Sequence, residues 1–134
     1  MTPVPGHDSL RGGAGNDELV GGDGDDFLGG DDGDDVLWGD GGRDLLIGGA
    51  GADVLYGGAD DDHLEGGNGK DEMAGDAGND TLIGGAGADK HIGGQGTDTA
   101  DYSTARKAVT VSLSGPKRGN TGDADGDSFV SVEN

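Results

Sequence analysis

Aspartate recurs at a constant interval of nine residues along most of this chain, and these carboxylates are its best candidates for chemistry. Successive nine-residue segments from residue 12 to residue 101 carry aspartate at the sixth position, and residues 3–11 keep it in an eroded segment. Repeated carboxylates attract cations and repel anionic partners. The eleven aspartates are Asp8, Asp17, Asp26, Asp35, Asp44, Asp53, Asp62, Asp71, Asp80, Asp89 and Asp98.

The other positions of the repeat indicate the elements that hold these aspartates. The eighth position is leucine or methionine in most segments and changes to His91 and Ala100 near the end. One apolar residue in nine is too few for the apolar stripe of a helix, and the apolar pattern is too short for a conventional strand. We therefore expect very short strands around the eighth position, with its side chain pointing inward.

Glycine dominates the first, second and fourth positions, where we expect it to supply the positive φ angles of tight turns. Asp31, Asp40 and Asp76 replace glycine at the second position, and aspartate tolerates left-handed conformations. Asp60 at a fourth position is a less favourable replacement.

The composition restricts the protein class. The 134 residues include 33 glycines and 28 acidic against 8 basic residues, a net charge of −20. Nucleic-acid binding is excluded by this charge, and no apolar run is long enough for a membrane span. The absence of cysteine excludes disulfides and thiolate metal sites. A chain this polar cannot fold on apolar burial alone, so an external factor must stabilise it.

The segment GGAGNDELV (residues 12–20) and its nine in-frame successors resemble the GGxGxDxUx nonapeptide of the RTX (repeats-in-toxin), hemolysin-type calcium-binding family. The resemblance implies an all-β fold, a right-handed parallel β-roll with two repeats per coil, so that stacked repeats are 18 residues apart. We expect a degenerate first repeat at 1–11, ten repeats at 12–101 and a short β-rich capping segment at 102–134.

The resemblance also implies several bound calcium ions, up to about nine, each between stacked aspartates from Asp8 with Asp26 to Asp80 with Asp98. Calcium binds about six to eight oxygen ligands, and turn carbonyls supply most of them in this family. One such site combines Gly13, Gly15 and Asp17 with Gly30, Asp32 and Asp35. The predicted carbonyl ligands are those of Gly13, Gly15, Gly22, Gly24, Gly30, Asp32, Gly33, Gly39, Gly41, Gly42, Gly48, Ala50, Gly51, Gly57, Ala59, Gly66, Asn68, Gly69, Gly75, Ala77, Gly78, Gly84, Ala86, Gly93 and Gln95.

The expected function is a non-enzymatic calcium-binding module, because no catalytic motif is found. It would fold on binding calcium outside a bacterial cell and stabilise a larger protein exported by type I secretion, of which this chain is a fragment. The alternatives are an accessory module of a secreted protease, lipase or polysaccharide-modifying enzyme, and an adhesin or surface-layer segment. The oligomeric state is left open.

Some residues carry a second interpretation. Val20, Trp38 and Tyr56 should line up with Val36 and Val54 on one flat side, either as ordinary surface or as a docking face for an absent domain. Phe27, Leu45 and Ile47 should lie on the opposite side.

The histidines and the tail are assigned structural roles. His7, His63 and His91 are expected to be solvent-facing or weakly packed. Strands are predicted at 108–113 and 129–132, where they could cap the roll. Asp123, Asp125 and Asp127 are interpreted as a solvated turn, with a cation site as the alternative.

Overall fold

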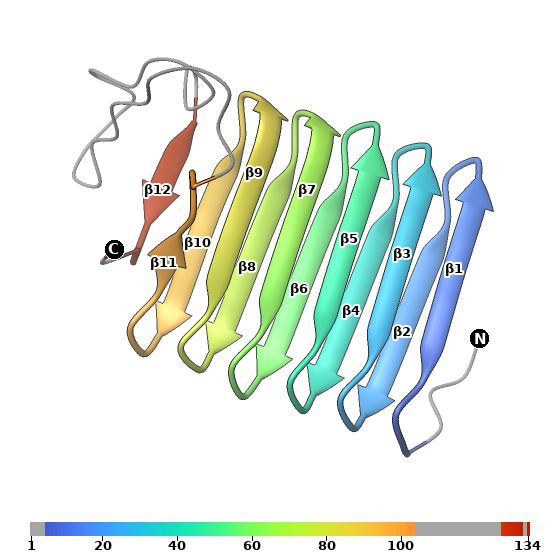
Figure 1. Ribbon diagram of the computed structural model, residues 1–134, viewed down its shortest axis with the longest axis horizontal. Helices are drawn as coiled ribbons and strands as arrows, with labels where there is room; N and C mark the ends of the chain where they lie inside the picture. The colour runs from blue at the N-terminus through green and yellow to red at the C-terminus, as the bar shows by residue number, and fades with distance from the viewer. Residues whose placement is uncertain (1–4, 104–126, 133) are drawn as a thin grey trace.

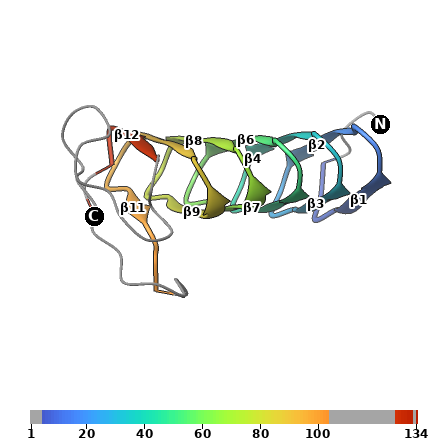
Figure 2. The ribbon, with the colours of Figure 1, turned by 90° about the horizontal axis from the view of Figure 1, so that it is seen from above.

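The computed structural model describes residues 5–103, 127–132 and 134. The described residues form a flattened coil of parallel strands, and none of them is helical. Figure 1 shows the strands side by side along the long axis, and Figure 2 shows that they form two facing layers. The all-β parallel roll predicted from the repeat is confirmed. None of the described segments is a helix of the length and apolarity that crossing a membrane requires.

The chain alternates between two six-stranded sheets, called sheet A and sheet B here. Sheet A consists of β1 (Ser9–Ala14), β3 (Phe27–Asp32), β5 (Leu45–Ala50), β7 (His63–Gly69), β9 (Thr81–Gly87) and β11 (Thr99–Ala100). Sheet B consists of β2 (Glu18–Asp23), β4 (Val36–Gly41), β6 (Val54–Ala59), β8 (Glu72–Ala77), β10 (Lys90–Gln95) and β12 (Ser128–Val130).

Neighbouring strands within each sheet pair residues that are 18 positions apart. Leu10 pairs with Leu28 in sheet A, and Leu19 pairs with Leu37 in sheet B. Each coil therefore holds two nonapeptides, as the resemblance implied. The stacking places the same repeat position of every second segment in one column.

Strands are longer than the repeat pattern predicted. Each full strand begins at the seventh position and continues to the third position of the next segment, as β4 shows, or to the fourth position in β7 and β9. The turn is therefore limited to the remaining two or three positions. Positive φ angles occur at the second and fourth positions, including Asp31 (77°) and Asp60 (78°).

First-position glycines do not have the positive φ that the sequence led us to expect. Gly30, Gly39 and their equivalents lie inside strands, and the described first-position residues are absent from the positive-φ set. Their lack of a side chain has a different cause. A Cβ at Gly48 would lie 2.5 Å from Asp53 Oδ2 and 2.7 Å from the carbonyl oxygen of Gly66. The first position is glycine because the aspartate and the next coil occupy that space.

The core is a single row of eighth-position side chains between the two sheets. Its central members are fully buried, and the row contains Leu10, Leu19, Leu28, Leu37, Leu46, Leu55, Leu64, Met73 and Leu82. Each side chain packs on its equivalents in neighbouring coils. This apolar row is thin, so much of the interior consists of polar turn residues.

The outer faces also carry aligned apolar side chains, as predicted. Trp38 pairs with Tyr56 on sheet B, and their rings stack at 6.0 Å between centroids. Phe27 pairs with Leu45 on sheet A. These contacts link successive coils from the outside.

The last strand of sheet B comes from the tail. Strand β12 pairs in parallel with β10, with His91 opposite Phe129. The strand predicted at 129–132 is therefore present, although it spans residues 128–130. The strand predicted at 108–113 lies outside the described residues.

Candidate metal site

The two long edges of the roll each carry a row of aspartates. The first edge precedes the strands of sheet B and contains Asp17, Asp35, Asp53, Asp71 and Asp89. The second edge precedes the strands of sheet A and contains Asp8, Asp26, Asp44, Asp62, Asp80 and Asp98. Asp8 and Asp17 are half-buried, while all from Asp26 to Asp98 are at most 4% exposed. All eleven sequence-predicted aspartates therefore belong to two continuous rows.

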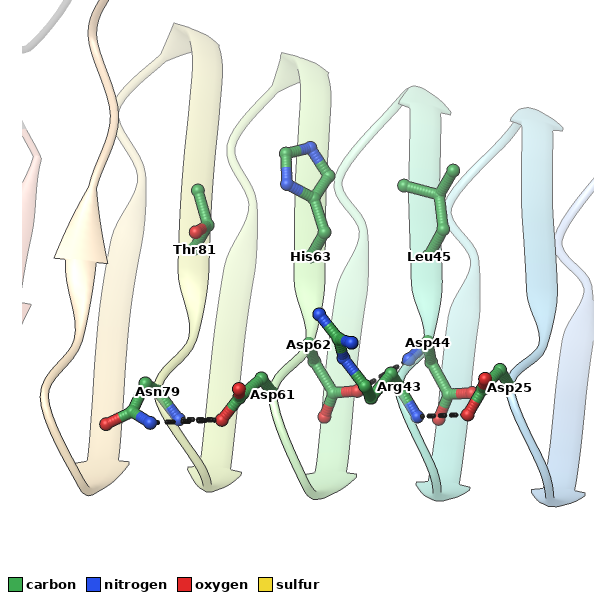
Figure 3. Close-up of a pocket in the computed structure, with 9 residues that line it drawn as sticks. All are labelled: Asp25, Arg43, Asp44, Leu45, Asp61, Asp62, His63, Asn79 and Thr81. Carbon is green, nitrogen blue, oxygen red and sulfur yellow. Dashed lines mark hydrogen bonds between the residues drawn. The ribbon is translucent and has the colours of Figure 1, made fainter.

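One carboxylate oxygen of each stacked aspartate binds the backbone of the coil before it. The N–H of Asp44 donates to Oδ1 of Asp62 at 2.8 Å, as Figure 3 shows. The same bond joins every pair along both edges, with N···O distances of 2.7 to 3.0 Å. These bonds fix the direction of each carboxylate.

The second oxygen is left without a partner in nine of the stacked aspartates. Oδ2 is buried and accepts no hydrogen bond in Asp17, Asp26, Asp35, Asp44, Asp53, Asp62, Asp71, Asp80 and Asp89. Buried polar atoms normally have a partner, and a buried charge without one is strongly unfavourable. Rows of such atoms with one sign of charge fit a series of bound cations.

Raised pKa values of several carboxyls in the two rows show the cost of leaving them without a counter-charge. Burial raises the pKa of Asp62 and Asp71 to about 7 and that of Asp44 and Asp80 to about 6. Neighbouring aspartates add to the rise, and the N–H donor to each carboxylate opposes it. The fold therefore holds protons more tightly than the unfolded chain does. Without cations its stability is greatest below about pH 4 and falls as the pH rises through 6 to 7.

A carbonyl oxygen of the next coil lies near the unpartnered carboxylate oxygen of several of these aspartates. Asp53 Oδ2 and the Gly66 carbonyl oxygen both lie within 3 Å of the point that a Cβ on Gly48 would occupy. Two oxygens from successive coils thus face the same small space, and a hard cation such as calcium prefers oxygen ligands. The residues present therefore fit calcium.

The structure places the predicted first-position carbonyls, but not the whole predicted set, near the unpartnered carboxylate oxygens. First-position carbonyls approach the unpartnered carboxylate oxygens, as Gly66 does. Third-position carbonyls accept a hydrogen bond from the fourth-position N–H of the preceding coil, for example Ala50 from Gly33 at 2.8 Å. A carbonyl oxygen has two lone pairs, so one remains for an ion. The contribution of the second- and fourth-position carbonyls stays a prediction.

A second ladder of side chains runs along the fifth positions, and the sequence pattern did not reveal it. Asp25 accepts the N–H of Arg43 at 3.0 Å, and Asp61 accepts the N–H of Asn79 at 2.8 Å (Figure 3). These side chains are exposed, in contrast to the sixth-position aspartates. Their oxygens cap turn N–H groups, so they stabilise the coil without forming a buried site.

Asp127 extends the first edge, which corrects its assignment to a solvated turn. It is fully buried, and its Oδ1 accepts the N–H of Asp89 at 2.8 Å, the bond that a sixth-position aspartate makes. The segment DSFV at 127–130 has aspartate and a large apolar residue at the right spacing, which is the signal that sequence reasoning missed. Asp123 and Asp125 lie outside the described residues.

The three histidines differ in environment. The His7 side chain is 75% exposed and His63 is half-buried, in line with the prediction. His91 is fully buried and stacks on Phe129 at 4.9 Å between centroids. The expectation of weak packing is therefore wrong for His91, because β12 supplies an aromatic neighbour.

The fold and the two rows of buried carboxylates define a parallel β-roll with cation-binding edges. A model of the RTX calcium-binding nonapeptide repeat matches residues 4–37, 38–73 and 65–100. The chain belongs to this family and is a calcium-binding β-roll module. Comparisons with curated proteins and with solved structures give no match.

Proposed function

We propose that this module is a calcium-dependent folding unit outside the cell, where it stabilises a larger protein or aids its secretion. The observation that carries the proposal is the row of buried, unpartnered Oδ2 atoms on each edge. The same carboxylates oppose folding when no cation is present and favour it when cations bind.

The stacked aspartate pairs would hold the ions, from Asp8 with Asp26 through Asp80 with Asp98. Bound calcium supplies positive charge between coils. About nine divalent ions would bring about eighteen positive charges to a chain with net charge −20. Because ions bind the folded state alone, their binding free energy adds to the stability of the fold.

The proposed role in secretion follows from the dependence of folding on calcium. A chain that stays unfolded at low calcium can cross a secretion channel and then fold in a calcium-rich medium. Affinities typical of extracellular modules, about 10⁻⁴ to 10⁻³ M, would suit such a switch. We propose a structural rather than enzymatic role for the module, since the aspartates face each other across coils as ligands.

Calcium titration monitored by circular dichroism and calorimetry tests the proposal. β signal should develop cooperatively with calcium and be lost on addition of a chelator, with several ions bound per chain. β signal undiminished by a chelator, or only one or two bound ions, would contradict the proposal.

A matched pair of variants assigns the effect to the edge. Asp53→Asn alters two stacked pairs, Asp35–Asp53 and Asp53–Asp71, so it should raise the calcium concentration needed for folding and lower the number of bound ions. Asp34→Asn changes an exposed fifth-position residue whose Oδ1 caps the N–H of Ala52. It should leave the number of bound ions unchanged.

A further inference from the structure

The C-terminal end of the first edge has a donor set unlike that of the regular pairs. One ligand atom from each of Asp89, His91 and Asp127 lies within 4.8 Å of the other two. All three side chains are at most 1% exposed. Among the described residues this is the group that combines an imidazole with carboxylates at such distances.

The individual contacts show how the group is held. His91 Nε2 lies 3.6 Å from Asp127 Oδ2 and 3.3 Å from the Tyr102 hydroxyl oxygen. The Tyr102 hydroxyl donates a hydrogen bond to Asp127 Oδ2. Asp89 uses Oδ1 to accept the N–H of Asp71 at 3.0 Å, while its Oδ2 is buried with no partner. An unpartnered carboxylate oxygen therefore accompanies the imidazole.

The regular pairs offer oxygen donors alone. Two residues after Asp53 and Asp71 the inward side chains are Leu55 and Met73, which carry no nitrogen or oxygen donor. Two residues after Asp89 it is His91. Imidazole nitrogen is a good ligand for zinc and similar transition-metal ions, whereas calcium prefers oxygen. The end of the edge thus has a different metal preference from the rest.

Charge also favours a cation at this position. Two buried carboxylates meet one imidazole, so the group keeps a negative charge even if the imidazole is protonated. Burying an uncompensated charge is unfavourable, and a divalent ion would offset it. His91 Nδ1 has no hydrogen-bond partner, which leaves Nε2 as the nitrogen that faces the carboxylates.

We propose that Asp89, His91 and Asp127 form a binding site for one zinc ion at the end of the first edge, next to the calcium site of the Asp71–Asp89 pair, with which it shares Asp89. The ion would join β10 to the tail strand β12, because two ligands belong to the roll and one to the tail. Tyr102 acts as a positioning residue that orients the Asp127 carboxylate. The proposal requires the folded roll but no particular number of calcium ions.

Zinc titration of the calcium-saturated protein tests this site. The wild-type protein should bind one zinc ion per chain in the presence of excess calcium, as measured by calorimetry. Replacing zinc with cobalt should give visible absorption bands typical of mixed nitrogen and oxygen ligands. A circular dichroism spectrum recorded before the titration shows separately whether calcium has folded the chain.

Variants identify the ligands. His91→Leu introduces the side chain found at most eighth positions, so the roll should still fold, but the stoichiometric zinc binding and the cobalt bands should be lost. His63→Leu removes an imidazole outside the group and should leave both unchanged. Tyr102→Phe should weaken zinc binding by about 10- to 100-fold, the usual cost of losing a partner of a metal ligand.

The outcomes separate this proposal from the proposed function. If the chain folds with calcium but binds no zinc, or if His91→Leu binds zinc as well as the wild type does, the zinc site is wrong and the calcium function stands. If calcium does not fold the chain, the proposed function fails instead. One zinc ion per chain that depends on His91 supports the site.

Discussion

In the regular coils and in the last coil of the first edge, an aspartate makes the same hydrogen bond to the coil before it. The length of chain between the two bonded aspartates differs. In the regular coils, Asp35 follows Asp17 after 18 residues and its Oδ1 accepts the Asp17 N–H at 2.7 Å. In the last coil, Asp127 follows Asp89 after 38 residues and makes the same bond at 2.8 Å. Spacing alone would assign this place to residue 107, which is lysine.

The difference shows what the stack requires of a coil. A strand joins the roll when it brings an aspartate to the edge and a side chain that fills the core two residues later, whatever the length of chain before it. Phe129 meets the second condition, since it lies opposite His91 and is 9% exposed. The last coil differs in that β12 is the terminal strand of sheet B among the described residues.

The largest expected difference between the two regions concerns the core. Leu55 is fully buried between coils on both sides, so Leu55→Ala should lower the free energy of unfolding of the calcium-bound protein by about 2 to 5 kcal/mol. Phe129→Ala should lower the free energy of unfolding by a smaller amount, because the last described coil packs against a coil on one side and can open locally. Denaturant unfolding in saturating calcium measures both.

Hydrogen exchange provides the control for this comparison. Phe129→Ala should increase exchange in β10 and β12 while β4 and β6 keep their protection. Equal loss of protection along the whole roll in both variants would show that β12 belongs to the cooperative unit and that our distinction is wrong.

A smaller effect is expected from filling the space beside one aspartate of the regular edge. Gly48→Ala would place a methyl group 2.5 Å from Asp53 Oδ2 and 2.7 Å from the Gly66 carbonyl oxygen, so it should destabilise the protein by about 1 to 3 kcal/mol and weaken calcium binding. Gly41→Ala is the matched control at a third position, where the nearest atom, Asp23 Oδ1, is 3.6 Å away. Equal calcium titrations for the two variants would contradict the assigned role of the first position.

The smallest predicted effect is that of pH on folding when no calcium is bound to the regular edge. The pKa values of Asp62 and Asp71 are raised to about 7 in the fold, so the protonated forms favour folding. Lowering the pH from about 8 to about 5 in the presence of a chelator should therefore increase β signal in circular dichroism. The gain should be small, because protonation removes repulsion without adding ligand bonds. A decrease in β signal on acidification would contradict this sign.

Much of the regular roll could be predicted from the sequence because one register satisfies every repeat. The interval of nine fixed the aspartate and leucine positions, and the resemblance to the RTX nonapeptide implied stacking at 18 residues, which the pairing of Leu19 with Leu37 confirms. The role of Gly48 could not be predicted in the same way. Glycine at a turn and glycine beside a crowded carboxylate look identical in a sequence.

The last coil shows a second limit. Periodicity ends at residue 101, and a four-residue segment such as DSFV carries too little information to be recognised alone. The close packing of His91 could not be predicted for the same reason, since its aromatic neighbour Phe129 comes from a distant part of the chain.

The sequence by itself determined the repeat, the recurring aspartate and leucine positions and the need for an external stabilising factor, because these follow from composition and local spacing. Only the tertiary structure decided which oxygen of the aspartates from Asp17 to Asp89 has no partner and which strand follows β10 at the end of the first edge. Those outcomes depend on contacts between coils, as when Asp62 binds the Asp44 N–H or Asp127 takes the place beside Asp89. Such contacts form between residues that are neighbours in space and distant along the chain, so local spacing does not contain them.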